Sequence, residues 1–144
     1  MERPHVPEAS QFRFRVRLRT RWCDEDNQQV LNNAVYLTLF EEARLAYFTQ
    51  LGFLRANQFP FLLAQTNVVF VALGRGGVEV DLEARTTSLG TTSFTQSYRV
   101  LDAARGTVWA QAEARLVIYD PGSGAKRAME PAFRAAIAGF EGLD

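Results

Sequence analysis

The sequence predicts a single α+β domain over residues 1–144, in which a five-stranded antiparallel sheet wraps around one long helix. Three observations predict this fold. Residues 12–22 alternate between apolar and arginine side chains, the period of a strand with one buried face. Residues 33–51 carry apolar side chains at spacings of three and four, the period of a core helix. Four more strand patterns follow, separated by short turns, which favours antiparallel neighbours.

The first strand is expected to have an apolar inner face and a basic outer face. The predicted inner face comprises Phe12, Phe14, Val16, Leu18, Thr20 and Trp22, and the outer face Arg13, Arg15, Arg17, Arg19 and Arg21. A polar loop over residues 23–31 separates this strand from the helix. Asn32 or Asn33 is expected to cap the helix N-terminus, and Gly52 is well placed just past its C-terminus.

The remaining strands are predicted over residues 62–73, 78–87, 94–101 and 107–119, and a short helix over residues 131–140. Turns are expected at residues 74–77, near Gly90 and Gly106, and at residues 121–124. Small side chains in the last strand would let the helix approach its inner face; these are Ala110, Ala112 and Ala114.

Charge predicts which strands are neighbours. Acidic residues alternate along the strand 78–87 at Glu79, Asp81 and Glu83, and they complement the arginines of the first strand. The apolar strand 62–73 is the best candidate for an exposed sheet edge. Because a monomer tolerates such an edge poorly, we expect a homodimer or homotetramer.

Composition excludes several classes of function. The net charge is zero, which gives no reason to expect a nucleic acid or a membrane as partner. Cys23 is the only cysteine, and the N-terminus lacks the apolar segment of a secretory signal, so we expect a cytoplasmic protein. The only histidine, His5, lies in an N-terminal tail that we expect to be mobile, so catalytic triads and histidine-rich zinc sites are not expected, and no metal site is predicted.

The segment 21–36, RWCDEDNQQVLNNAVY, resembles the hotdog-fold thioesterases of the 4-hydroxybenzoyl-CoA type. The segments 36–44, YLTLFEEAR, and 88–94, SLGTTSF, are also similar to that family. This chain departs from the family pattern within the loop, where Gln28 and Gln29 stand in place of a usual glycine and Val30 in place of the histidine of many members. It departs again at the junction 90–92, where some members have basic residues and this chain has Gly-Thr-Thr.

The resemblance implies an acyl-CoA thioesterase that needs no cofactor other than the coenzyme A of its substrate. It implies that Asp26 is the catalytic carboxylate and that a backbone N–H of Asn33 or Ala34 binds the thioester oxygen. It implies substrate contacts from the strand end, the loop, the first helical turn and the strand junction: Trp22, Gln29, Tyr36, Gly90, Thr91, Thr92 and Ser93.

Physical chemistry supports the same site without the family. A carboxylate attacks a thioester carbonyl directly or deprotonates a water that does so. The free N–H groups of a helix N-terminus stabilise both the carboxylate and the developing oxyanion. The resemblance also leaves one alternative: a second hotdog subgroup has its carboxylate on the helix, which would correspond here to Glu41 or Glu42. Two other functions stay open: hydrolysis of acyl groups on acyl carrier protein, and non-catalytic acyl binding.

Overall fold

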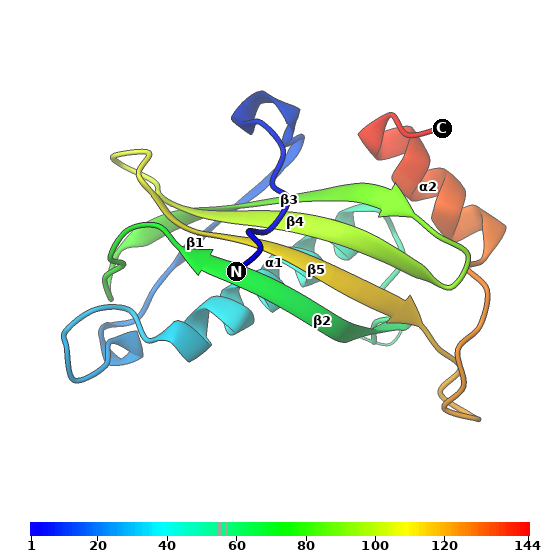
Figure 1. Cartoon of the computed structure of the whole chain (residues 1–144), viewed down its shortest axis with the longest axis horizontal. Helices are drawn as coiled ribbons and strands as arrows, with labels where there is room; N and C mark the ends of the chain where they lie inside the picture. Colours follow the sequence, from blue (N-terminus) through cyan, green and yellow to red (C-terminus); the bar gives the residue numbers. More distant parts are fainter. Residues whose placement is uncertain (55, 57) are drawn as a thin grey trace.

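The computed structural model describes residues 1–54, 56 and 58–144. Its elements are β1 (Phe14–Arg19), α1 (Asn33–Gln50), β2 (Phe61–Phe70), β3 (Glu79–Leu89), β4 (Ser93–Asp102), β5 (Val108–Ile118) and α2 (Pro131–Glu141), with 3₁₀ turns at Ala9–Gln11 and Trp22–Asp24. The strands form one antiparallel sheet in the order β1-β3-β4-β5-β2. Helix α1 lies behind this sheet (Figure 1). The predicted α+β architecture is confirmed.

Strand β1 is shorter than the alternation indicates. It ends at Arg19, and the chain then turns into the 3₁₀ turn that begins at Trp22. The Trp22 side chain is therefore 83% exposed instead of lying on the inner face. Phe12 precedes the strand, and its ring lies 5.7 Å from the Arg99 guanidinium carbon. The inner-face prediction is wrong for these two aromatic residues because regular pleating stops before it reaches either of them.

The predicted pairing of the basic and acidic strands is confirmed. In the β1–β3 ladder, Arg15 faces Glu83 and Arg17 faces Asp81. An Arg15 Nη2–Glu83 Oε2 contact of 3.1 Å and an Arg17 Nε–Asp81 Oδ1 contact of 3.1 Å join the strands. The carboxylates of Asp81 and Glu83 are buried, whereas Arg15 and Arg17 remain more than half exposed, so the arginines cover the acidic groups.

Helix α1 forms as its sequence pattern indicates. Asn32 caps it, since its Oδ1 accepts a hydrogen bond of 2.9 Å from Ala34 N. Gly52 follows the helix with φ of 79°, the left-handed conformation that ends many helices. The three alanines of β5 are buried, in keeping with their predicted place on the inner face.

A buried polar network links α1 to the sheet and to α2. Arg44 Nη1 donates to Tyr98 Oη at 3.2 Å, and Tyr47 Oη donates to Glu141 Oε2 at 3.2 Å. The two ends are joined through hydrogen bonds of Gln96 and Thr86. Burial raises the pKa of the Glu141 carboxyl and raises the pKa of Tyr98 to about 12. Because broken buried hydrogen bonds are costly, this network fixes the rotation of α1 against the sheet.

The N-terminal segment crosses the sheet face opposite α1, in front of β4 and β5 (Figure 1). Its backbone carbonyls accept hydrogen bonds from the sheet: His5 O from Ser97 Oγ at 2.8 Å, and Glu2 O from Asn67 Nδ2 at 3.1 Å. The segment that contains His5 is therefore seated on the sheet, whereas the sequence predicts a mobile tail there. Among the described residues, no helix is long and apolar enough to cross a membrane.

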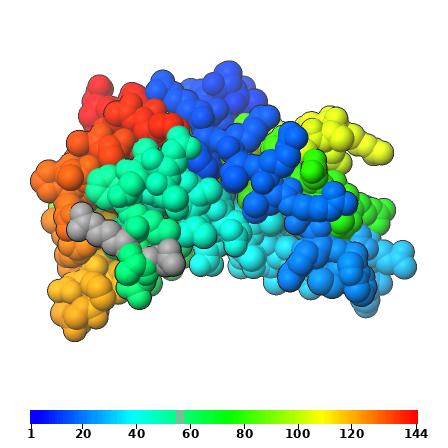
Figure 2. Space-filling model, turned by 180° about the vertical axis from the view of Figure 1, so that it is seen from behind, coloured from blue at the N-terminus to red at the C-terminus, as the bar shows by residue number. Residues whose placement is uncertain are grey.

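Strand β2 is an edge of the sheet, as predicted, and pairs with β5 on one side only. Exposed apolar side chains lie along it and just beyond its end; these are Leu62, Leu63, Phe70, Val71 and Leu73. Seen from behind, α1 (cyan to teal) is also uncovered along the middle of the molecule, between the loop 20–32 and α2 (Figure 2). Unpaired backbone groups beside exposed apolar side chains are the features of an interface.

We predict that the protein is at least a dimer at micromolar concentration, because pairing two copies of β2 satisfies this edge. Sedimentation velocity should show a species of two chains or more. Leu63→Lys should shift the distribution toward single chains, since an edge lysine opposes strand addition. A wild-type protein that sediments as a monomer would contradict this prediction.

Candidate active site

The loop between β1 and α1 folds into a small hairpin. Asp26 N donates to Val30 O at 2.9 Å, Gln29 N donates to Asp26 O at 3.0 Å, and Asn32 N donates to Asp24 O at 2.9 Å. These bonds fold residues 24–26 back against residues 30–32. The hairpin therefore brings its acidic residues alongside the segment that leads into α1.

This hairpin is seated on the glycine turn, which we define as residues 74–77. Leu31 N donates to Gly74 O at 3.0 Å, and Gly76 N donates to Glu25 Oε2 at 2.9 Å. There is no room for side chains at the contact: a Cβ at Gly76 would lie 2.5 Å from the Arg21 carbonyl oxygen. Glycine at this point lets two backbone segments approach closely.

The carboxylates of Asp24 and Asp26 have different surroundings. Asp24 is buried, and its oxygens accept hydrogen bonds from Arg21 N at 2.8 Å and from Arg21 Nη2 at 2.8 Å. Although burial opposes ionisation, these bonds lower the pKa of Asp24 below its ordinary value. Asp24 is thus an anchor of the loop.

Asp26 is only partly buried. Its Oδ1 accepts a hydrogen bond of 2.8 Å from Gln28 N. Within the described part of the chain, its Oδ2 has no hydrogen-bond partner. One carboxylate oxygen is therefore fixed by the hairpin, while the other is available to water or to a ligand.

The N-terminus of α1 offers one free amide. Asn33 is the first residue of the helix. The Ala34 amide is occupied by the capping side chain of Asn32, and Val35 N donates to Asn32 O at 3.0 Å. For the Asn33 amide, the described residues provide no such acceptor. Of the two amides that the sequence proposes for the thioester oxygen, the one of Asn33 is thus the better placed.

Two other predicted substrate contacts lie beside this hairpin. Tyr36 is 2% exposed and packs edge-on against Phe70, with 5.2 Å between ring centroids. Burial raises the pKa of the Tyr36 hydroxyl to about 12, so it is neutral at physiological pH. Trp22 lies at the surface, where only a ligand or a second chain can cover its ring.

Gln29 occupies a backbone conformation that suits glycine, with φ of 61°. This accounts for the glycine expected near this position in the family. Its carbonyl oxygen accepts a hydrogen bond from Arg75 Nη1, so the glycine turn holds the tip of the hairpin as well as its base.

The strand junction lies at the other end of the sheet. Residues 90–92 connect β3 to β4, and Ser93 is the first residue of β4. The hairpin instead lies beside the start of β3. Strand β3 has 11 residues, and a strand of that length spans roughly 35 Å. Backbone hydrogen bonds tie the junction to the C-terminal part of the chain, through Thr92 O to Ile118 N and Thr91 O to Met129 N. One chain does not bring the predicted site residues together.

The alternative carboxylates, Glu41 and Glu42, are exposed on α1. They line a shallow groove with Thr38, Leu45 and Phe59. Within the described ranges, no three histidine, cysteine or acidic side chains gather in a way that could hold a metal ion.

The comparison with known families decides the identity of the fold. A family described as the thioesterase-like superfamily matches residues 18–137. This chain belongs to the thioesterase-like superfamily. The predicted hotdog thioesterase family is thereby confirmed, and thioester hydrolysis is the activity that membership supports. No curated protein matches the chain.

Solved structures agree with this membership. A thioesterase from Thermus thermophilus, solved in complex with coenzyme A and zinc, is 30% identical, covers 93% of this chain and 98% of its own, and has a TM-score of 0.82. A 1,4-dihydroxy-2-naphthoyl-CoA thioesterase from Synechocystis is 17% identical and has a TM-score of 0.76. The match covers 87% of this chain and 95% of that protein. The PA5185 protein from Pseudomonas aeruginosa is 20% identical and has a TM-score of 0.82. The match covers 91% of this chain and 93% of that protein. The last two share the fold.

We predict that Gln29→Gly raises the stability of this superfamily member. A left-handed conformation costs a side-chain-bearing residue about 1–2 kcal/mol, and part of this gain is offset because glycine loses more entropy on folding. The melting temperature should rise by about 1–4 °C. Gln28→Gly is the matched control and should lower the melting temperature, since Gln28 has no positive φ to relieve. Equal shifts in both variants would contradict the interpretation.

Proposed function

We propose that the protein hydrolyses acyl-CoA thioesters, with Asp26 as the catalytic carboxylate and the Asn33 amide as the donor to the thioester oxygen. The observation that carries this proposal is the hairpin, which fixes one oxygen of Asp26, leaves the other free and returns directly into the N-terminus of α1. A free amide and a free carboxylate oxygen are the two groups that thioester hydrolysis requires.

The proposed reaction breaks the bond between the carbonyl carbon and sulfur. In one route Asp26 takes a proton from water while the water oxygen attacks the carbonyl carbon. In the other, the carboxylate attacks the carbon itself and water then cleaves the resulting anhydride. In both, the thioester oxygen becomes an oxyanion beside the Asn33 amide, and coenzyme A leaves as a thiol after gaining a proton. The N-terminal dipole of α1 adds to this stabilisation.

We further propose that a second chain completes the site. Antiparallel pairing of two β2 edges about a two-fold axis extends the sheet and keeps both α1 helices on the same face. The second copy then runs in the opposite direction, so its strand junction approaches the Asp26 end of the first copy. Gly90, Thr91, Thr92 and Ser93 of one copy, with Trp22, Gln29 and Tyr36 of the other, are the proposed substrate contacts.

The coenzyme A moiety is proposed to enter only as part of the substrate. The Thermus thermophilus relative, solved with coenzyme A, supports this substrate class by similarity over nearly the full length of both chains. Acyl carrier protein remains the alternative carrier of the acyl group. A non-catalytic acyl-binding protein is the other alternative, although it would have no use for a free carboxylate at Asp26.

We predict that Asp26→Asn lowers turnover of acyl-CoA by on the order of 10²–10⁴-fold, the usual contribution of a positioned acid or base. The affinity for substrate should change much less, because the amide preserves the size of the side chain and the helix N-terminus is intact. Steady-state hydrolysis across a panel of acyl-CoAs, with binding measured separately by calorimetry, checks both expectations.

The controls are Glu41→Gln and Glu42→Gln, which should leave turnover near the wild-type value. Asp24→Asn should mainly lower the melting temperature, because it weakens the ion pair that anchors the loop to Arg21. Near-normal turnover in Asp26→Asn, with loss in Glu41→Gln or Glu42→Gln, would move the catalytic carboxylate to the helix. Acyl-CoA binding without hydrolysis by the wild type would favour the non-catalytic alternative.

A further inference from the structure

An apolar pocket lies at the end of the molecule opposite Asp26, between the segment that precedes β2, the end of β5, the segment that follows β5, and α2. Its volume is about 200 Å³. Aromatic rings make much of its wall: Phe59 stacks on Phe61 with 4.7 Å between centroids, and Phe133 packs edge-on against Phe53 at 5.2 Å. The apolar lining residues are Phe53, Phe59, Pro60, Ile118, Pro121 and Phe133.

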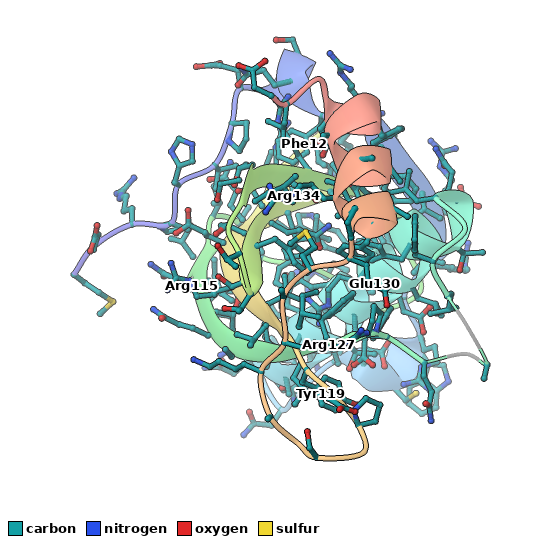
Figure 3. The ribbon with its side chains drawn as sticks, turned by 90° about the vertical axis from the view of Figure 1, so that its right-hand side faces the viewer. Phe12, Arg115, Tyr119, Arg127, Glu130 and Arg134 are labelled. Carbon is teal, nitrogen blue, oxygen red and sulfur yellow. The ribbon has the colours of Figure 1, made fainter. Side chains whose placement is uncertain are left out.

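Among the described residues that line this pocket, the two charged side chains, Arg127 and Glu130, are paired with each other. Arg127 Nη1 contacts Glu130 Oε1 at 3.0 Å, and Arg127 Nε donates to Tyr119 O at 3.1 Å. Arg127, Glu130 and Tyr119 lie close together below α2 in Figure 3. Because the one cation among the described lining residues is paired with a carboxylate, this part of the lining suits an uncharged apolar group better than an anion.

The position of the pocket relates it to β2. Phe59 and Pro60 directly precede β2, which begins at Phe61. Gly74 follows β2, and its carbonyl oxygen accepts a hydrogen bond from Leu31 of the hairpin that contains Asp26. The pocket and the hairpin thus belong to opposite ends of the same edge strand. When two copies of β2 pair antiparallel, the start of one strand faces the end of the other. Each pocket then comes to the same end of the dimer as the Asp26 hairpin of the second copy.

We propose that this pocket binds the acyl group of a thioester whose carbonyl lies at Asp26 of the second copy. This assignment rests on the proposed function. An engineered apolar cavity of ~150 Å³ holds benzene, so a pocket of this size takes a benzoyl group or a straight chain of roughly six carbons. The proposed substrate class is therefore acyl-CoA with a compact, uncharged acyl group.

The test enlarges the pocket and follows the acyl-length profile. Wild type and Phe59→Ala are assayed with acetyl-, hexanoyl-, decanoyl-, palmitoyl- and benzoyl-CoA. The wild type should prefer the hexanoyl and benzoyl thioesters. Phe59→Ala should raise the ratio of kcat/KM for decanoyl-CoA to that for hexanoyl-CoA by roughly tenfold or more, because removing the ring opens space for further methylene groups.

Phe140→Ala is the matched control. Phe140 is also a partly buried phenylalanine with an aromatic partner, Tyr47, but it lies outside the pocket. Removal of the Phe140 ring should lower stability as the Phe59 change does. It should not change the ratio of kcat/KM for decanoyl-CoA to that for hexanoyl-CoA. A ratio is insensitive to a uniform fall in activity, so an unfolding effect does not imitate the expected result.

The remaining outcomes separate this inference from the proposed function. Suppose that the wild type hydrolyses thioesters in an Asp26-dependent way while Phe59→Ala keeps the same acyl-length profile. That result would overturn the pocket assignment and leave the proposed function standing. It would fit a pocket that is filled by side chains of the second copy. If the wild type hydrolyses no thioester, calorimetry with hexanoyl-CoA and free coenzyme A still tests the pocket. The pocket assignment would be supported if the wild type binds hexanoyl-CoA more tightly than free coenzyme A and this difference in affinity is smaller in Phe59→Ala. It would be overturned if the wild type binds hexanoyl-CoA and free coenzyme A with equal affinity.

Discussion

The candidate site depends on one close approach, the seating of the acidic hairpin on the glycine turn. A Cβ at Gly74 would lie 2.5 Å from the Tyr36 hydroxyl and 2.8 Å from the Trp109 ring, so a side chain there would displace one of these neighbours. The same turn accepts a hydrogen bond from Leu31 and holds the hairpin tip through Arg75. Contacts between the hairpin and the glycine turn therefore set where the Asp26 carboxylate lies relative to the start of α1. The carboxylate does not have to make these contacts itself. The buried network around Arg44 fixes the other half of the helix against the sheet.

The second constraint is the unpaired edge of β2. Its exposed apolar side chains and free backbone groups favour a second copy, and the strand separates two halves of the proposed site. The hairpin with Asp26 lies at one end, and the apolar pocket and the junction at Gly90 lie at the other. A single feature thus relates assembly to function: pairing the edges protects them from further strand addition and, in the proposed dimer, completes two sites.

Sequence patterns predicted the parts of this fold that repeat with a simple period. The alternation of arginines against Asp81 and Glu83 predicted a neighbouring pair of strands that the register confirms. The spacing of apolar residues and Asn32 predicted α1 to within one residue at each end. Irregular segments were missed, because regular pleating does not extend to Trp22 and because His5 is held through its backbone carbonyl, which no side-chain pattern reveals. The apolar pocket was also missed, since its rings come from segments that only the tertiary fold brings together.

The central claim, that two chains share each site, is tested most directly by subunit complementation. Asp26→Asn removes the carboxylate, and Phe59→Arg places a charged side chain in the pocket at the other end. Each variant alone should be nearly inactive. After the two are unfolded together and refolded as a mixture, half of the dimers contain one chain of each kind, and each of these has one intact site, so activity should return to about a quarter of the wild-type value. A mixture that stays as inactive as its components, with mixed dimers shown to be present, would place the whole site within one chain and contradict the account.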